Sequence, residues 1–156
     1  MNKNINRLSK IHNTDVMYYW ANNVYQFIHE LEKTYPNITK WYFNKVIPSI
    51  IKGDGVREII YVLDDNDNIS ATMILKDTVT EKKISSILVD KQHQRAGIGT
   101  ALLKSAILYL GTSTPKITVP ECKINDFLKI FKNFNFKHTD SVNNMYIDGI
   151  TELIFN

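Results

Sequence analysis

The pattern that most constrains the fold of this chain is a strand, a loop, a helix and a second strand in its second half. Residues 84–89 are the most apolar strand candidate in the sequence. The apolar residues within positions 102–110 then fall on one helical face, which Gly111 and Pro115 bring to an end. Residues 116–119 follow as another strand. This order predicts two parallel neighbouring strands joined by a right-handed crossover helix, with the first strand near the centre of the sheet.

The first third of the chain is mainly helical in pattern. Residues 14–33 carry apolar side chains at three- and four-residue spacing, which predicts an amphipathic helix capped by Thr14 or Asp15. Residues 41–51 predict a second, short helix, although Pro48 fits poorly inside one.

The remaining segments complete an α/β order of elements. A hairpin precedes the central strand, and a helix and two further strands follow the βαβ unit. These elements are strands at residues 59–63 and 69–75, a helix at 124–134, and strands at 136–142 and 145–155.

Length and composition indicate a globular protein. We expect residues 1–156 to form a single domain, and 44% hydrophobic against 22% charged residues is unlike a disordered chain. No secretory leader and no run of about 18 apolar residues is present. Cys122 is the one cysteine, which favours a reducing compartment. We therefore expect a cytoplasmic protein with no membrane partner.

The ionisable residues exclude further classes. With a net charge of +3 and no run of like charges, nucleic acid is not an expected partner, whereas an anionic small ligand is suitable. The four histidines lack metal-ligand spacing. The acidic segment 64–68 is not a calcium loop, because Ile69 and Leu75 stand where such a loop needs glycine and glutamate. We expect no metal.

Two glycines stand where a polar loop enters the helix, in the sequence Gln94-Arg95-Ala96-Gly97-Ile98-Gly99. Such glycines leave the N–H groups of the first helical turn open, and these bind phosphate with the help of the helix dipole. A dinucleotide fingerprint does not fit, because Leu102 replaces its third glycine and a long polar segment precedes the first. A nucleotide-hydrolase loop does not fit, because no Gly-Lys-Ser/Thr follows.

This hexapeptide resembles the Q/R-x-x-G-x-G/A motif of the GNAT superfamily of N-acetyltransferases, and the order of elements along nearly the whole chain is similar to that family. The resemblance implies a mixed, largely antiparallel sheet of about six to seven strands, with a parallel central pair splayed at the cofactor site and about four flanking helices. It also implies direct transfer of an acetyl group from acetyl-CoA to a primary amine. The acceptor is not identified and could be a small molecule, peptide or protein, and the resemblance leaves a homodimer open.

The resemblance also implies which residues bind the co-substrate. Two residues at the end of the first strand would meet the pantetheine arm, and the Gly-rich turn would surround the pyrophosphate. Asn125 lies one residue from the position of a coenzyme A-binding asparagine in the family. The implied cofactor-binding residues are Leu88, Val89, Gln94, Arg95, Ala96, Gly97, Ile98, Gly99, Thr100 and Asn125.

The catalytic positions of the family are not filled in the usual way. Phe131 falls on the tyrosine that often protonates the departing thiolate, so we consider Tyr146 in the terminal hairpin as the acid. Ile84 falls on a glutamate that some members use as a base. Glu121, directly after the second strand of the βαβ unit, is the preferred candidate because strand ends in open α/β sheets face the ligand crevice.

Three functions stay open at this point. The first is an N-acetyltransferase, and the second is a non-catalytic acyl-CoA-binding regulatory module, because Phe131 and Ile84 occupy two common catalytic positions. Acetylation of an amine linked to RNA is the third, permitted by the mild positive charge. The aromatic residues of the first third, Tyr35 and Trp41 among them, either pack in the core or line an acceptor pocket.

Overall fold

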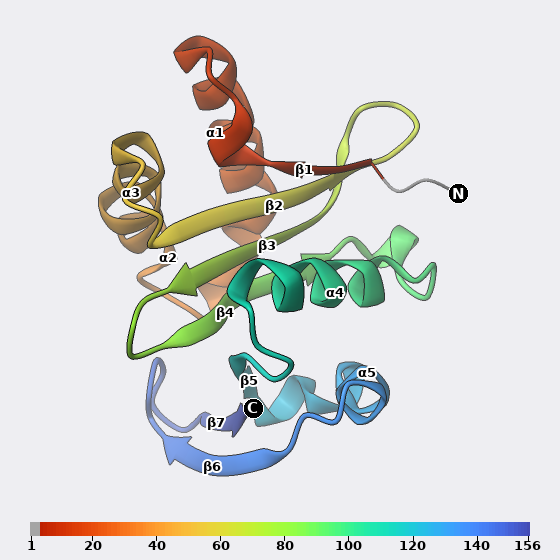
Figure 1. Ribbon diagram of the computed structural model, residues 1–156. Coiled ribbons are helices and arrows are strands. Elements are labelled where there is room, and N and C mark those ends of the chain that lie inside the picture. Colours follow the sequence, from red (N-terminus) through yellow and green to blue (C-terminus); the bar gives the residue numbers. More distant parts are fainter. Residues whose placement is uncertain (1–3) are drawn as a thin grey trace.

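The computed structural model describes residues 4–156, in which one seven-stranded sheet runs through the molecule (Figure 1). Its strand order is β1-β2-β3-β4-β5-β7-β6, and β4 and β5 are the parallel neighbours, all other pairs being antiparallel. The strands are β1 (Asn4–Arg7), β2 (Arg57–Leu63), β3 (Ile69–Asp77), β4 (Lys82–Val89), β5 (Lys116–Pro120), β6 (His138–Asn143) and β7 (Thr151–Phe155).

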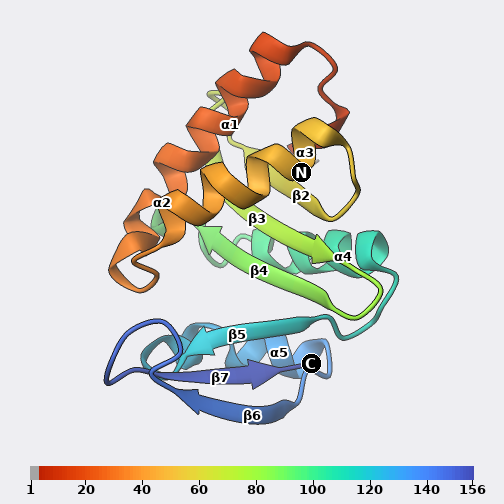
Figure 2. The same cartoon turned by 90° about the vertical axis from the view of Figure 1, so that its left-hand side faces the viewer.

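Helices cover both faces of the sheet (Figures 1 and 2). Three lie on one face and two on the other. On the first face are α1 (Thr14–Ile28), α2 (Ile38–Trp41) and α3 (Ile47–Lys52), and on the second are α4 (Ile98–Leu110) and α5 (Leu128–Asn133). None of the helices between residues 4 and 156 has the length and apolar character that a bilayer crossing requires.

The predicted βαβ unit is confirmed. Strand β4 occupies the middle of the sheet, α4 is the crossover, and β5 lies parallel to β4. The apolar face of α4, with Leu102, Leu103 and Ala106, is buried against the sheet. The mixed sheet with a parallel central pair therefore agrees with the fold class expected from the sequence.

The sheet separates two apolar cores, one under each helical layer. Leu102 of α4 and Phe131 of α5 belong to the core on one face. Val24 and Ile28 of α1, with the fully buried Tyr42, belong to the other. Each face of the central strands is therefore buried, which explains why these strands are continuous apolar runs in the sequence.

The helical first third differs from the expectation at its ends. Helix α1 is capped by the side chain of Asn13, which accepts a hydrogen bond from the Val16 N–H at 3.0 Å, so the expected caps Thr14 and Asp15 are wrong. The α-helix ends at Ile28 and continues as a 3-10 helix, His29–Lys33.

The second helix begins earlier than expected and contains a π turn. It runs from Ile38 through the wide turn Tyr42–Val46 into α3. Pro48 follows shortly after this turn, where the wider π pattern already interrupts the regular hydrogen-bond ladder of an α-helix. The π turn therefore accounts for a proline that is unfavourable in a regular helix interior.

Strand β1 was not expected from the sequence, because Asn4–Arg7 has one apolar residue and no alternating pattern. It pairs with β2 at the edge of the sheet. The Arg7 guanidinium donates to the buried Glu58 carboxylate at 3.0 Å, and Ser9 donates to the same carboxylate from its hydroxyl and its N–H. Strand β1 is therefore held at the sheet edge by a long-range ion pair rather than by the strand propensity of its residues.

Candidate functional site

The parallel strands β4 and β5 are paired only at their start. Two residue pairs, Lys83 with Lys116 and Ile84 with Ile117, form the whole ladder between them. Beyond these pairs the strands diverge, as Figure 2 shows. The edge of β4 that continues toward Val89 therefore has backbone groups without a partner strand, which a ligand can use.

A bulge in β4 lies at the point of divergence. Ile74 of β3 is opposite Ser86 and Leu75 is opposite Ile84, so Ser85 has no partner. A bulge turns two consecutive side chains toward one face. Ser85 and Ser86 accordingly both line a cavity on the α2 face of the sheet.

The loop after β4 is held in place by its own polar residues. Asp90 accepts hydrogen bonds from the Gln92 N–H at 3.3 Å and the His93 ring at 2.9 Å. The Gln94 side chain donates to the Val89 carbonyl at 3.2 Å. Gln94 therefore ties the Gly-rich turn back to the end of β4.

The turn itself uses left-handed backbone at two positions. Arg95 has a φ of 62° and Gly97 has a φ of 76°. Gly97 is the N-cap of α4, and it has no side chain that could cap the helix. Residues Gln94 to Gly97 are exposed, so the turn is open to a ligand.

The first turn of α4 presents N–H groups without partners. The first bond at this end of the helix runs from the Ala101 N–H to the Gly97 carbonyl at 3.1 Å. Within residues 4–156, the N–H groups of Ile98, Gly99 and Thr100 donate to no protein acceptor, and the turn contains no acidic side chain. Such a helix start binds phosphate oxygens.

Gly99 faces α5. A Cβ atom at this position would lie 3.4 Å from Cδ1 of Ile130 in α5, which is an ordinary van der Waals contact. Packing against α5 therefore does not by itself require a glycine here.

We expect Gly97→Ala to weaken acetyl-CoA binding, because the left-handed backbone at this cap costs a non-glycine residue about 1–2 kcal/mol and the strain falls on the free N–H groups. Gly111→Ala is the matched control. Gly111 has a φ of 65° at the other end of the same helix, with nothing within 4 Å of an added Cβ. Calorimetry should show weaker binding for Gly97→Ala and similar thermal destabilisation for both. Equal affinities in the two variants would contradict the assignment of the turn.

A cavity of about 350 Å³ lies on the other side of the splayed strands from α4. Its walls come from the turn and helix around α2, from β2, β3 and β4, and from the loop between β6 and β7. The lining residues are Tyr35, Pro36, Asn37, Ile38, Trp41, Arg57, Lys76, Glu81, Lys83, Ser85, Ser86, Met145 and Tyr146.

Glu152 of β7 lies next to this lining. Its side chain is 1% exposed, and β7 places it opposite Pro120 at the end of β5. Burial raises the pKa of its carboxyl to about 7, and the Lys83 ammonium offsets only part of that rise. Its charge in turn contributes to the raised pKa values of Tyr35 and Tyr146, which line the cavity.

Two buried polar atoms at this site have no hydrogen-bond partner. They are Oε2 of Glu152 and Oγ of Ser86, and they are the only such side-chain atoms found among the described residues 4–156. Unsatisfied buried polar atoms are costly and therefore rare. Ser86 is on β4 and Glu152 is on β7, next to β5, so the two atoms belong to the region around the diverging strands, which favours a ligand there.

Tyr146 lies in the loop between β6 and β7 and faces the cavity. Its ring packs edge-on against Tyr35 at 5.0 Å between centroids. Burial raises the pKa of its hydroxyl, while a hydrogen bond to Thr118 of β5 lowers it. The tyrosine is therefore protonated at neutral pH and lies near β5, the strand that diverges from β4.

The other candidate residues lie in different environments. Glu121 and Asn125 are exposed in a 3-10 helix, Glu121–Asp126, and neither lines the cavity. Leu88 packs toward the α1 core and Val89 toward the α4 core. The structure thus brings Tyr146 to the cavity and leaves Glu121 at the surface.

The sequence analysis did not single out Glu152, Lys83 or Arg57. The signal for Glu152 was weak, because Thr151–Phe155 contains one carboxylate followed by three consecutive apolar residues and shows no clear alternation. The side to which the Glu152 side chain points could not be predicted from the sequence, because it depends on which face of the last strand meets the cavity.

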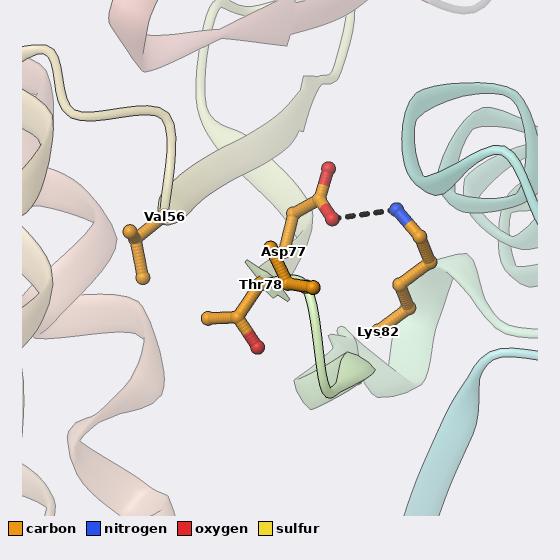
Figure 3. Close-up of a pocket in the computed structure, with 5 residues that line it drawn as sticks. Val56, Asp77, Thr78 and Lys82 are labelled. Carbon is orange, nitrogen blue, oxygen red and sulfur yellow. Dashed lines mark hydrogen bonds and ion pairs between the residues drawn. The ribbon is translucent and has the colours of Figure 1, made fainter.

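A second hollow lies at the β3–β4 turn (Figure 3). It is lined by Val56, Asp77, Thr78, Val79 and Lys82, and the Lys82 ammonium pairs with Asp77 at 2.7 Å. It lies at the start of β4, whereas the Gly-rich turn follows the end of that strand. Because its charges are already paired, we do not treat it as the functional site.

The fold and the free N–H groups at the start of α4 fit a domain that binds an acyl-coenzyme A. Comparison with known families supports this class. The model of the acetyltransferase (GNAT) domain matches residues 56–138, so the chain belongs to the GNAT acetyltransferase family. Within the described residues 4–156, no three His, Cys, Asp or Glu side chains converge to hold a metal ion.

Solved structures share the fold at low sequence identity. A GNAT-family acetyltransferase from Bacillus cereus ATCC 10987 aligns with a TM-score of 0.66 and 21% identity over 99% of this chain and 96% of its own. A nourseothricin acetyltransferase aligns with a TM-score of 0.60 and 15% identity over 65% of each chain.

A third structure contains the co-substrate. A putative streptothricin acetyltransferase from Bacillus anthracis str. Ames in complex with acetyl coenzyme A aligns with a TM-score of 0.56 and 15% identity, over 65% of this chain and 62% of its own. The match thus spans less than two thirds of each of these two acetyltransferases. A search of curated protein sequences finds no significant match.

Proposed function

We propose that this protein transfers an acetyl group from acetyl-CoA to a primary amine by direct attack. The observation that carries the proposal is the divergence of β4 and β5, which lies between the free N–H groups of α4 and the cavity on the opposite face. A thioester that follows the β4 edge from the Gly-rich turn would meet an amine held in that cavity.

In this proposal the residues of the turn bind the co-substrate mainly through backbone. Gln94, Arg95, Ala96, Gly97, Ile98, Gly99 and Thr100 surround the pyrophosphate, and the backbone of Leu88 and Val89 pairs with the pantetheine arm. The free N–H groups at 98–100 and the missing ladder along β4 support these roles. Asn125 is exposed in the 3-10 helix after β5 and stays a candidate contact.

The chemistry needs a base, because an amine with a pKa near 10.4 is largely protonated at pH 7. We propose that Glu152 accepts the ammonium proton, directly or through one water. Its raised pKa, about 7, suits that task, and its Oε2 is otherwise without a partner. Glu121 is exposed at the surface and does not line the cavity, so we prefer Glu152 over Glu121.

The bonds and protons then balance. The neutral amine nitrogen bonds to the acetyl carbon, and the carbon–sulfur bond breaks with release of the thiolate. Tyr146 donates its proton to that thiolate, and its raised pKa keeps it protonated for the task. The acetylated nitrogen still carries a second proton, which returns to the Tyr146 phenolate as the amide forms, and the proton on Glu152 passes to solvent. Holding amine and thioester together supplies much of the acceleration.

The proposal is tested by measuring acetyl-CoA binding with calorimetry and thiol release over a broad panel of amines and peptides. Binding with a 1:1 stoichiometry and amine-dependent thiol release are expected. Failure to bind acetyl-CoA would end the proposal.

One observation favours a non-catalytic acyl-CoA-binding module instead. Ile84 and Phe131, which stand at two common catalytic positions of the family, are both buried in the α4 core. Such a module would bind acetyl-CoA without amine-dependent thiol release. Specific turnover that is lost in Tyr146→Phe would exclude it.

A further inference from the structure

We infer that the acceptor is a small primary amine that also carries an anionic group, a carboxylate or a phosphate, and that Arg57 and Lys83 hold this group. The inference rests on the proposed function, because it names the substrate class of the same site.

The first argument is the charge of the cavity lining. Three cationic side chains, Arg57, Lys76 and Lys83, face it together with one carboxylate, Glu81. Glu81 is already engaged, since it pairs with Lys76 at 2.8 Å and with Lys116 at 3.3 Å. The cavity therefore has an excess of positive charge that its own carboxylate does not neutralise.

Two of these cations lack a counter-ion. Among residues 4–156, no carboxylate oxygen lies within 4.0 Å of the side-chain nitrogens of Arg57 or Lys83. Glu81 and, to a smaller extent, Asp54 act on Arg57 only from a distance. Glu81 is paired with Lys76 and Lys116, and Oδ1 of Asp54 already accepts hydrogen bonds from Ser49 and the Val56 N–H. An anion in the cavity would be the first close partner for both cations.

Burial makes the lack of a counter-ion costly for Arg57 and Lys83. Both side chains are partly buried, and burial is the main cause of the lowered pKa of Lys83 and of Arg57. Arg57, Lys76 and Lys116 lower the pKa of Lys83 further, while Glu81 opposes this. A bound anion offsets both the burial and the mutual repulsion, so its binding is favourable.

The Arg57 guanidinium is held in place by two contacts. It donates to the Ser85 hydroxyl at 3.2 Å, and it lies 5.7 Å from the centroid of the Trp41 ring. A guanidinium has five donors, and one of them is used here. A fixed, planar fork with free donors suits carboxylate and phosphate oxygens.

The position of Glu152 completes the recognition of an amine that carries an anion. Arg57 belongs to β2 and Glu152 to β7, on the other side of the gap, and Lys83 of β4 is near enough to Glu152 to act on its pKa. An ammonium near Glu152 and an anion near Arg57 would each meet the opposite charge. The volume of about 350 Å³ suits a small acceptor.

The experiment compares amines that differ only in the anion. Each common amino acid is assayed beside its decarboxylated amine, and O-phosphoethanolamine beside ethanolamine, by thiol release from acetyl-CoA. We expect kcat/KM to be about 10- to 100-fold higher for the anionic member of at least one kind of pair, because hydrogen bonds to charged groups have this effect. The two kinds of pair distinguish carboxylate from phosphate.

Variants assign the preference to the two cations. Arg57→Met and Lys83→Met should each remove most of it by raising KM for anionic amines alone, and Arg57→Lys should retain part of it. Lys45→Met is the matched control, since Lys45 is exposed and does not line the cavity. Thermal unfolding and acetyl-CoA calorimetry on every variant separate lost recognition from lost folding.

Equal or faster reaction of the amines without an anion would overturn the inference, and so would the absence of turnover with every anionic amine. A preference that survives in both Met variants would overturn the assignment to Arg57 and Lys83. Acetyl transfer to other amines would leave the proposed function standing in these cases. Loss of the proposed function has a separate readout, namely no acetyl-CoA binding and no thiol release with any amine.

Discussion

Replacement of Glu152 by Gln should lower kcat/KM for acetyl transfer by about 10²- to 10⁴-fold, the usual contribution of a positioned base. Glutamine has nearly the same shape and cannot accept the proton. Acetyl-CoA affinity should be unchanged, because Glu152 lies on β7, away from the Gly-rich turn. Calorimetry and thiol-release kinetics on the same preparation measure the two quantities. Unchanged kcat/KM in Glu152→Gln would remove this residue from the mechanism.

The pH profile gives the same residue a signature of its own. The base must be ionised, so kcat/KM of the unaltered protein should rise as pH increases through about 7, the pKa of Glu152. Glu152→Gln should lack this limb and retain a rise at higher pH from the acceptor amine. Glu121→Gln discriminates between the two candidate bases, because the profile near pH 7 changes only if Glu121 is the group that titrates.

The raised pKa of Glu152 also predicts how stability depends on pH. A carboxyl whose pKa rises on folding, here from 4.5 to about 7, favours the folded state in its neutral form. This stabilisation is present below pH 4.5 and is lost as pH rises through about 7, at a cost of about 3 kcal/mol. Denaturant unfolding should therefore show Glu152→Gln to be more stable than the parent at pH 8.5 but not at pH 4.5.

The second large effect is on folding. Phe131→Ala should destabilise the protein by about 3–5 kcal/mol, because truncation of a buried aromatic residue leaves a cavity. The Phe131 ring is 2% exposed and packs against Phe127, Phe136 and Phe155, with centroids 5.4, 5.2 and 4.7 Å away. It joins α5 to the final strand of the sheet.

Leu128→Ala is the matched control for Phe131→Ala. Leu128 lies on the same helix but is 51% exposed, so its loss should change the free energy of unfolding by no more than about 0.5 kcal/mol. Urea unfolding monitored by circular dichroism measures both variants. Equal effects of the two substitutions would show that the ring cluster does not hold α5.

Much of the fold could be predicted because pattern and packing agree. The strand at Ile84 to Val89 is buried between two helical layers, and the helix after Gly97 is apolar on the face that packs against the sheet. The type and order of these elements could therefore be predicted from the sequence. Strand β1 could not be predicted, since its position depends on Arg7 meeting Glu58, far away in the sequence. The cap of α1 at Asn13 lies one residue before the expected start, within the usual uncertainty of helix ends.

The two halves of the candidate site differ in how far the sequence could predict them. The Gly-rich turn is local, so its residues could be named from a short motif. The proposed acceptor site combines Arg57, Lys83 and Tyr146 of the cavity lining with Glu152 next to it, from four separate parts of the chain. Tyr146 was found through its place in the terminal hairpin, whereas the other three depend on strand register and a bulge that no local pattern reveals.

The backbone pairing between β4 and β5 is confined to the start of the two strands. Strands β1–β4 and strands β5–β7 form two parts of the sheet that are joined by only two residue pairs. Most of the interaction between these two parts therefore comes from the apolar core under α4 and α5. In this core, side chains such as Leu102 of α4 and Ile117 of β5 belong to one cluster with side chains of β2, β3 and β4. The width of the gap is thus set by side-chain packing rather than by peptide hydrogen bonds.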